Sequence, residues 1–128
     1  MPDIRIDPFP SPEEFAALWP AAWDGAEAPD FTRILSRSLA HLGAYHDGRL
    51  IGFVNVAWDG GIHAFVLETV VHPDFRRRGI ASDLVRRAVE VAGERGAHWL
   101  HVDFEPHLEE FYRACGFRPT SAGLISLQ

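Results

Sequence analysis

Three consecutive arginines precede a glycine in the middle of the chain, in the run Arg76-Arg77-Arg78-Gly79-Ile80-Ala81. The run follows an apolar segment at 63–71 and precedes an amphipathic segment at 80–95. A helix start leaves backbone N–H groups unpaired and carries partial positive charge, so a helix beginning here would suit a phosphate or pyrophosphate. Gly79 allows close backbone approach, and the arginines add cationic donors. The alternative is a solvated basic turn, because neither a P-loop nor a GxGxxG motif is present.

Glu68 is the single charged residue in the apolar run from Ala64 to Val71. A charge buried without a partner is costly, and burial would raise the pKa of this carboxyl toward neutral pH. A carboxylate with such a pKa is a good proton acceptor, which makes Glu68 a candidate base. The alternative is a structural ion pair between Glu68 and one of the arginines.

A second set of ionisable residues, His101, Asp103 and Glu105, alternates along the strand expected after the long helix. Alternation places the three side chains on one face, where they could line a substrate pocket or relay a proton. A solvated polar face is the alternative. His98 points to the opposite face, so we expect no metal site here. We expect Cys115, the only cysteine, to be a packed thiol rather than a nucleophile.

The elements that must position these residues follow from hydrophobic periodicity and turn signals. Ser11-Pro12-Glu13-Glu14 is a capping box that begins a helix, which we expect to stop before Pro20. Asp30 would cap a second helix reaching Leu39, and the later helices are expected at 80–95 and 106–115. Strands are expected at 4–6, 42–46, 50–58, 63–71, 99–104, 117–119 and 124–127. The order predicts a mixed α/β fold around one sheet.

Size and charge exclude several classes of protein. The 128 residues fit one domain with one core. The net charge of −6, with all twelve positive side chains being arginine, disfavours nucleic-acid binding and weakly favours a cationic substrate. One cysteine cannot form an internal disulfide, and residues 1–14 lack the basic start and apolar stretch of a signal peptide. We therefore expect a soluble, cytoplasmic protein with no membrane partner.

Two segments resemble motifs of the GNAT superfamily of N-acetyltransferases. The first, Val70-Val71-His72-Pro73-Asp74-Phe75-Arg76-Arg77-Arg78-Gly79-Ile80-Ala81, is similar to its cofactor-binding motif. The second, Phe111-Tyr112-Arg113-Ala114-Cys115-Gly116-Phe117, is similar to its [FL]-Y-x-x-x-G-F motif. The spacing leaves room for one helix and one strand, and the resemblance covers about Leu42 to Phe117.

The resemblance implies a twisted, mostly antiparallel sheet of about six to seven strands, with helices on both faces and two splayed central strands. It implies that acetyl-CoA lies between those strands as a cosubstrate, with no metal. The backbones of Val70 and Val71 would pair with the pantetheine arm, and the amides from Arg76 to Ser82 would hold the pyrophosphate. The resemblance also groups His72 with the cofactor-binding residues, whereas its type alone suggests an ordinary polar position, as for His63.

For the chemistry, the resemblance implies direct acetyl transfer in a ternary complex. Tyr112 matches the tyrosine that protonates the CoA sulfur, although a packing tyrosine is the alternative. Glu68 or an ordered water would be the base, and the Val71 N–H would stabilise the oxyanion. Glu105 stands where the family often has Asn, which leaves that family contact open.

The acceptor is expected to be a primary amine of a small molecule or peptide, and a homodimer is possible in this family. A non-catalytic acyl-CoA sensor is an alternative function. A toxin or resistance enzyme acting on transfer RNA or an aminoglycoside is another, and the acidic charge disfavours transfer RNA.

Overall fold

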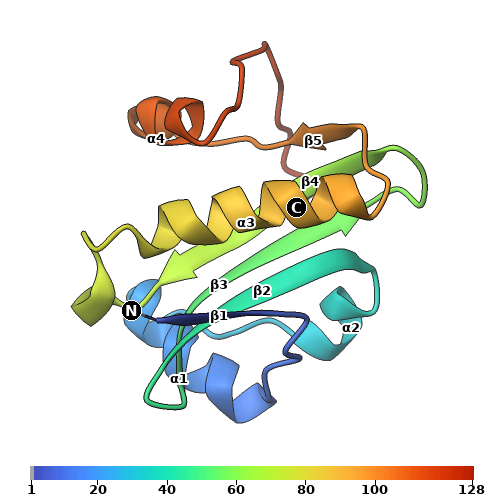
Figure 1. Cartoon of the computed structure of the whole chain (residues 1–128). Helices are drawn as coiled ribbons and strands as arrows, with labels where there is room; N and C mark the ends of the chain where they lie inside the picture. Colours follow the sequence, from blue (N-terminus) through green and yellow to red (C-terminus); the bar gives the residue numbers. More distant parts are fainter. Residues whose placement is uncertain (1) are drawn as a thin grey trace.

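A computed structural model describes residues 2–128, which form one five-stranded sheet in the order β1-β2-β3-β4-β5 (Figure 1). The first four strands pair antiparallel, and β4 pairs with β5 in parallel. Their bounds are β1 Asp3–Ile6, β2 Ser38–His46, β3 Arg49–Trp58, β4 His63–Val71 and β5 Trp99–His101. The predicted mixed α/β class and mostly antiparallel sheet are confirmed.

Helices cover both faces of the sheet (Figure 1). Their bounds are α1 Pro12–Ala22, α2 Phe31–Leu35, α3 Ile80–Glu94 and α4 Glu109–Ala114, with 3-10 turns η1 Pro73–Phe75 and η2 Pro106–Leu108. One face packs Phe15 and Phe31 of α1 and α2 against Phe53 of β3. The other packs Leu84 and Ala88 of α3 against residues of β2, β3 and β4. Two cores thus fix β4 from both sides.

The first helix begins as predicted but ends later. The Ser11 hydroxyl accepts from the Glu14 N–H, and the Glu14 carboxylate accepts from the Ser11 N–H. The predicted stop before Pro20 is wrong, because α1 continues to Ala22. Proline lacks an N–H, so it removes only one hydrogen bond in this last turn. Burial of Trp19 just before it holds the turn in place.

The second helix ends earlier than predicted. It stops at Leu35, and Leu39 belongs to β2, which begins at Ser38 rather than at 42. The reason is non-local, since Ser38 lies opposite Ala57 and its hydroxyl donates to the Asn55 side chain across the β2–β3 ladder. Pairing with the long strand β3 therefore overrides the helical spacing of Leu39.

The last third of the chain departs most from expectation. The strand expected at 99–104 is β5, three residues long, and the expected helix at 106–115 divides into η2 and α4. The strands expected at 117–119 and 124–127 are absent, so the described sheet has five strands rather than six or seven. Leu124, Ile125 and Leu127 are 90%, 80% and 93% exposed, and a strand without a partner is not stable.

Candidate functional site

The two strands that contain or precede the expected site residues separate partway along their length. β4 and β5 pair only from His63 opposite Trp99 to Phe65 opposite His101. On its other side β4 stays paired with β3 as far as Val71, which lies opposite Gly52. The carboxyl-terminal half of β4 therefore has one open edge, as expected for splayed strands.

A β-bulge in β4 lies at this open edge. The register shifts between the pairs Asn55–Leu67 and Phe53–Val70, so Glu68 and Thr69 together oppose Val54. Glu68 has a φ of 57°, a left-handed conformation that is costly for a residue with a Cβ. Such strain at a bulge re-aims side chains and is common next to active sites.

The bulge leaves polar groups without partners. Glu68 Oε2 and Thr69 Oγ1 are buried and have no hydrogen-bond partner within residues 2–128. Burial raises the pKa of the Glu68 carboxyl above its ordinary value. No ion pair in the described part of the chain includes Glu68, so the alternative of a structural ion pair fails.

Tyr112 of α4 faces the same bulge. Its ring stacks on Phe104 at 5.0 Å between centroids and meets Phe117 edge-on at 5.8 Å. Burial raises the pKa of the Tyr112 phenol, and the neighbouring Thr69 hydroxyl lowers it. The two hydroxyls are thus close, although Thr69 forms no hydrogen bond of good geometry. The fold brings Tyr112 and the Glu68–Thr69 bulge together across the opening.

Backbone geometry singles out Val71 on β4. The His72 N–H donates to the Ile51 carbonyl at 2.7 Å, which makes Gly52–Val71 the non-hydrogen-bonded pair of the ladder. The Val71 N–H therefore points away from β3, toward the open edge. The neighbouring pair Phe53–Val70 is then the hydrogen-bonded one, so the Val70 backbone faces β3.

The arginine-rich turn begins α3 with unpaired amides. Arg77 and Gly79 have φ values of 64° and 78°, and both are exposed. The first helical bond runs from the Asp83 N–H to the Gly79 carbonyl at 3.0 Å. Within residues 2–128, no acceptor is bound to the N–H groups of Ile80, Ala81 and Ser82. This exposed helix start has the free donors that an anion requires.

The three arginines have different surroundings. Arg76 donates from Nε to the Val71 carbonyl at 3.2 Å and from a terminal nitrogen to the Ala22 carbonyl at 3.0 Å. Its own N–H donates to Pro73, so Arg76 ties the turn to β4 and α1. Arg78 lies over the Phe75 ring, with Cζ 5.1 Å from the centroid.

His72 also holds the turn. Its Nδ1 accepts from the Asp74 N–H at 3.1 Å, which caps η1, and its Nε2 lies 2.9 Å from an Arg49 nitrogen. Both ring nitrogens are therefore engaged with the protein. The ring of His72 thus positions the loop before the arginines.

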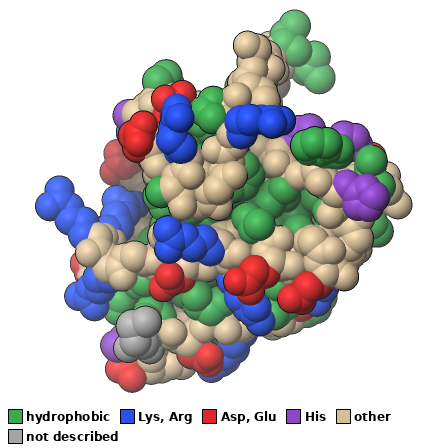
Figure 2. Space-filling view, turned by 45° about the horizontal axis from the view of Figure 1, so that its top comes forward, with side chains coloured by type: hydrophobic (Ala, Val, Ile, Leu, Met, Phe, Trp, Pro, Cys, Tyr) green, Lys and Arg blue, Asp and Glu red, His purple; other side chains and the backbone are tan. Residues whose placement is uncertain are grey.

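A cavity of about 900 Å³ lies beside β5 and reaches Tyr112. Figure 2 shows hydrophobic side chains gathered in a hollow on this side of the molecule. The walls include Phe65, Leu67, His101 and Asp103, whereas Glu105 lies outside them before η2. His101 stacks on Phe65 at 4.8 Å and lies 2.8 Å from His63 Nδ1 through its Nε2.

Sequence reasoning missed Thr69, Phe65 and His63. The period of two along β4 could have placed Phe65 and His63 on one face, but no local signal connects Thr69 with Tyr112. Cys115 is buried, as expected for a packed thiol. In the described residues, no group of three or more possible metal ligands occurs, and no helix is long and apolar enough to cross a bilayer.

A profile of the Acetyltransferase (GNAT) family matches residues 3–117. The chain belongs to this family.

Individual relatives cover different lengths. The chain is 47% identical over 66 residues to the mycothiol acetyltransferase of Mycolicibacterium vanbaalenii, a match that covers 52% of this chain and only 22% of that protein. A GNAT-family acetyltransferase of Streptococcus pneumoniae has a TM-score of 0.80 with 25% identity, and the match covers 100% of both chains. An aminoglycoside N-acetyltransferase in complex with CoA has a TM-score of 0.74 with 23% identity, covering 100% of this chain and 95% of the other. The similarity to the aminoglycoside N-acetyltransferase shows that this chain has the same fold.

Proposed function

We propose that this chain transfers an acetyl group from acetyl-CoA to a primary amine of a small molecule or peptide, directly and in one ternary complex. The observation that carries the proposal is the set of unpartnered polar groups along the open edge of β4. Glu68, Thr69 and the Val71 N–H line this edge opposite Tyr112, and the free amides of α3 begin beyond it. Buried polar groups normally have partners, so such a row favours a bound molecule.

The free amides of α3 would hold the pyrophosphate of the coenzyme. Three unpaired N–H groups and the helix dipole favour an anion, and the exposed guanidinium groups of Arg77 and Arg78 lie in the same turn. Arg76 and His72 would act by holding this turn in place. The Val71 N–H would donate to the pantetheine arm or to the carbonyl oxygen that becomes an oxyanion.

Glu68 is the proposed base. The amine must lose a proton before or during attack, and a carboxylate whose pKa is raised by burial accepts it better near neutral pH. The left-handed φ of Glu68 aims the side chain at a position that a regular strand would not give. An ordered water between Glu68 and the amine would perform the same transfer.

Tyr112 is the proposed acid. A phenol whose pKa is raised by burial stays protonated at neutral pH and can donate its proton to the departing thiolate. Thr69, which faces the phenol, would orient that proton. Acetyl-CoA supplies the activated thioester, and the residues above bind it, orient it and move protons.

The acceptor is proposed to enter through the cavity beside β5. His101 and Asp103 are polar positions in its walls, as are Glu109, Arg113 and Arg118, and most of the remaining lining is apolar or aromatic. The likeness to a mycothiol acetyltransferase and an aminoglycoside N-acetyltransferase supports a small polar amine. The buried, unpaired Cys115 supports a reducing, cytoplasmic setting. A homodimer is also part of the proposal, and the outer edge of β5 supports it, because no strand of the described residues pairs with that edge.

A screen of amino sugars, polyamines, aminoglycosides and peptides with acetyl-CoA, measuring released thiol, tests the activity. With any acceptor found, Tyr112→Phe should lower kcat about a hundredfold while acetyl-CoA affinity is kept, because general acids contribute at least about that much. The other tyrosine of the chain offers a matched control. Tyr45 is buried in the core that α1 and α2 form against β3, away from the open edge of β4, so Tyr45→Phe should leave kcat unchanged. Tight acetyl-CoA binding with no turnover of any amine would instead support the sensor alternative.

A further inference from the structure

A pair of histidines joins β4 and β5 where the two strands are still paired. His63 Nδ1 lies 2.8 Å from His101 Nε2, and the ring centroids are 5.1 Å apart. His101 also stacks on Phe65, with an interplanar angle of 23°. Ala64 and Val66 pack in the core beside α3, so alternation places His63 and Phe65 on the opposite face of β4. The pair therefore lies on the face of the sheet away from α3, where His101 lines the cavity.

The contact between the two imidazole rings determines how many protons the pair presents to a ligand. A neutral imidazole has one N–H donor and one acceptor nitrogen, so a neutral pair holds one proton between the rings and one outward N–H. Uptake of one further proton turns both outward nitrogens, Nε2 of His63 and Nδ1 of His101, into donors and gives the pair one positive charge. A carboxylate, with two oxygen acceptors and one negative charge, matches this arrangement.

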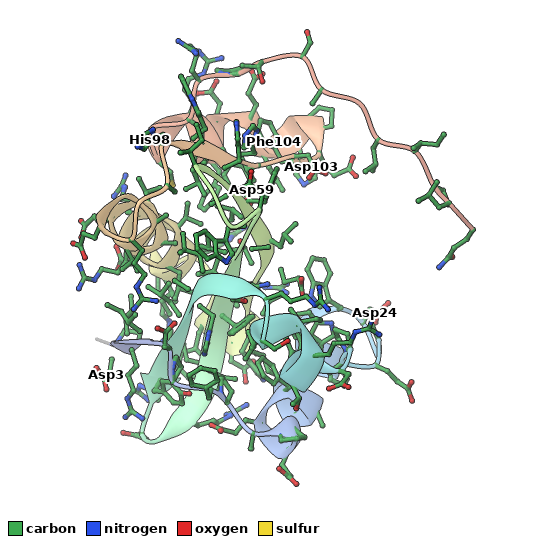
Figure 3. All side chains as sticks on the ribbon, turned by 90° about the vertical axis from the view of Figure 1, so that its right-hand side faces the viewer. Asp3, Asp24, Asp59, His98, Asp103 and Phe104 are labelled. Atoms are coloured by element: carbon green, nitrogen blue, oxygen red, sulfur yellow. The ribbon has the colours of Figure 1, made fainter. Side chains whose placement is uncertain are left out.

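The charged groups around the pair leave the sign of the favoured ligand to the histidines. The cavity walls contain two acidic and two basic side chains, Asp103, Glu109, Arg113 and Arg118. Asp59 lies in the turn before β4, at the same end of the sheet as Asp103 (Figure 3). Its Oδ1 accepts from the N–H groups of Gly61 at 2.7 Å and His63 at 3.3 Å. No carboxylate of residues 2–128 forms an ion pair with either ring of the pair, so both rings remain available to an anion.

The part of the cavity beyond the pair is suited to the amine. Burial is the main cause of the raised pKa of the Tyr112 phenol, and the charge of Asp103 adds to it, so Asp103 lies near the proposed acid. Asp103 follows His101 by two residues, and Glu68 follows Phe65, which lies opposite His101, by three. At about 3.3 Å per residue, the pair lies roughly 7 Å along the chain from Asp103 and roughly 10 Å from Glu68. An amine at these two carboxylates would therefore be several bonds from an anion at the pair.

We propose that the His63–His101 pair binds a carboxylate of the acceptor, so that the substrate is a primary amine with a carboxylate several bonds away. This inference rests on the proposed acetyl transfer, whose acceptor it specifies. Both outward nitrogens of the protonated pair donate to the carboxylate. Phe65 and Leu67 contact the apolar chain that joins the two ends of the acceptor. An ω-amino acid or a short peptide has this form, although the net charge of −6 alone would favour a cationic acceptor.

Three six-carbon amines that differ in the charge at the far end test the inference. 6-Aminohexanoate ends in a carboxylate, hexylamine in a methyl group and 1,6-diaminohexane in a second ammonium. At slightly acid pH, kcat/KM should be about tenfold or more higher for 6-aminohexanoate than for the other two, as expected for a hydrogen bond to a charged group. This preference should fall as pH rises, because the pair loses the added proton. The ratio of two amines at one pH cancels the effects of pH on Glu68 and on the coenzyme. Equal values for the three amines, or a preference that does not change with pH, overturns the inference.

Substitutions of single histidines test whether the pair is responsible. His63→Asn and His101→Asn should each lower the ratio of 6-aminohexanoate to hexylamine about tenfold, because an amide gains no proton. His98→Asn is the matched control, since His98 lies on the α3 side of the sheet (Figure 3), and it should keep the parent ratio. A pair that only joined β4 to β5 would affect the amines alike, so an unchanged ratio in both pair variants overturns the assignment.

Proton NMR of the chain without acetyl-CoA separates this inference from the proposed transfer. Hexanoate, which has the carboxylate but no amine, should shift the ring signals of His63 and His101 toward those of protonated imidazole and leave those of His98 in place. Hexylamine should shift none of them. Shifted rings in a chain that acetylates no amine would refute the acetyl transfer and support the carboxylate site. Turnover of amines by a chain whose rings do not respond to hexanoate would refute the carboxylate site alone.

Discussion

His41 on β2 and Glu68 on β4 are ionisable side chains of one sheet that are buried or half-buried, and of the two only His41 has hydrogen-bond or ion-pair partners among the described residues. Its Nε2 accepts from the Phe9 N–H at 2.9 Å, and its Nδ1 lies 3.5 Å from Asp7, which also pairs with Arg95 at 2.7 Å. Glu68 Oε2 has no partner in the described residues. A satisfied polar group fixes the fold, and an unsatisfied one marks where a ligand completes it.

The contrast extends to the two halves of the sheet. β2 and β3 pair along nearly their whole length and are covered on both faces. β4 and β5 pair over three positions, and the bulge and the free amides of α3 lie where β4 is open. The first half is expected to determine stability and the second to determine binding and rate.

The largest expected effect is on the anion site of α3. Gly79→Asp should weaken acetyl-CoA binding about a hundredfold or more, because juxtaposed like charges cost several kcal/mol. A Cβ at Gly79 meets nothing within 4 Å, so the carboxylate would project from the open turn. Calorimetry of acetyl-CoA binding measures the loss.

Gly79→Asn is the matched control, since Asn has the shape of Asp and tolerates the left-handed backbone. It should keep affinity within a few-fold. Equal losses in the two variants would show that backbone strain, and not charge, weakens binding, and the pyrophosphate would then lie elsewhere.

A smaller effect is expected at the bulge. Glu68→Gln should slow turnover about tenfold to a hundredfold, at or below the lower end of the usual contribution of a general base, because water can replace the carboxylate in part. The rate of the parent should fall as pH falls through the raised pKa of Glu68, and the variant should lose this acid limb. A variant profile that keeps the acid limb would remove Glu68 as the base.

The same substitution should raise stability. The pKa of Glu68 is higher in the folded than in the unfolded chain. The carboxyl therefore contributes to the stability of the fold below its unfolded-state pKa, and this contribution is lost as pH rises through its folded-state pKa. Above that folded-state pKa the parent holds a poorly solvated charge, and there Glu68→Gln should have the higher Tm. Glu94→Gln, at the exposed end of α3, is the control and should change neither rate nor Tm.

Sequence reasoning found what depends on local pattern. The capping box, the α3 helix and the isolated charge of Glu68 follow from neighbours in the chain, and the structure has all three. The resemblance gave Val70 and Val71 the same role, whereas the Val70 backbone faces β3 and the Val71 N–H faces the open edge. The bulge shifts the alternation of the strand by one residue between Leu67 and Val70, and a sequence pattern with a period of two does not predict such a shift.

Other features depend on contacts distant in sequence. Arg76 resembles its two neighbours in type, yet its guanidinium reaches the Ala22 carbonyl 54 positions away. Thr69 meets Tyr112 only because α4 folds back over β4. The tail was predicted to form strands from its apolar residues, but a strand also requires a partner, which no residue pattern supplies.

The smallest effect on activity is expected at His41, in the fully paired half. His41→Leu leaves the Phe9 N–H without its acceptor, which should reduce the free energy of unfolding by about 1–3 kcal/mol. The rate per folded molecule should stay unchanged, because this network is separate from the residues of the open edge. Urea unfolding and a thiol-release assay on the same samples measure both quantities.

The pH dependence of stability separates His41 from the other histidines. Burial lowers the pKa of His41, with Asp7 opposing this shift and Arg95 adding to it, so the folded chain binds the proton less readily than the unfolded chain does. The unfolded chain protonates it first, and stability should therefore fall as pH falls below about 6.5, the ordinary pKa of histidine. His41→Leu should lose this part of the slope, whereas His46→Leu, at an exposed position, should keep it. If stability depends on pH in His41→Leu as it does in the parent, the lowered pKa of His41 does not contribute to stability. The contrast between a partnered His41 and an unpartnered Glu68 would then be wrong.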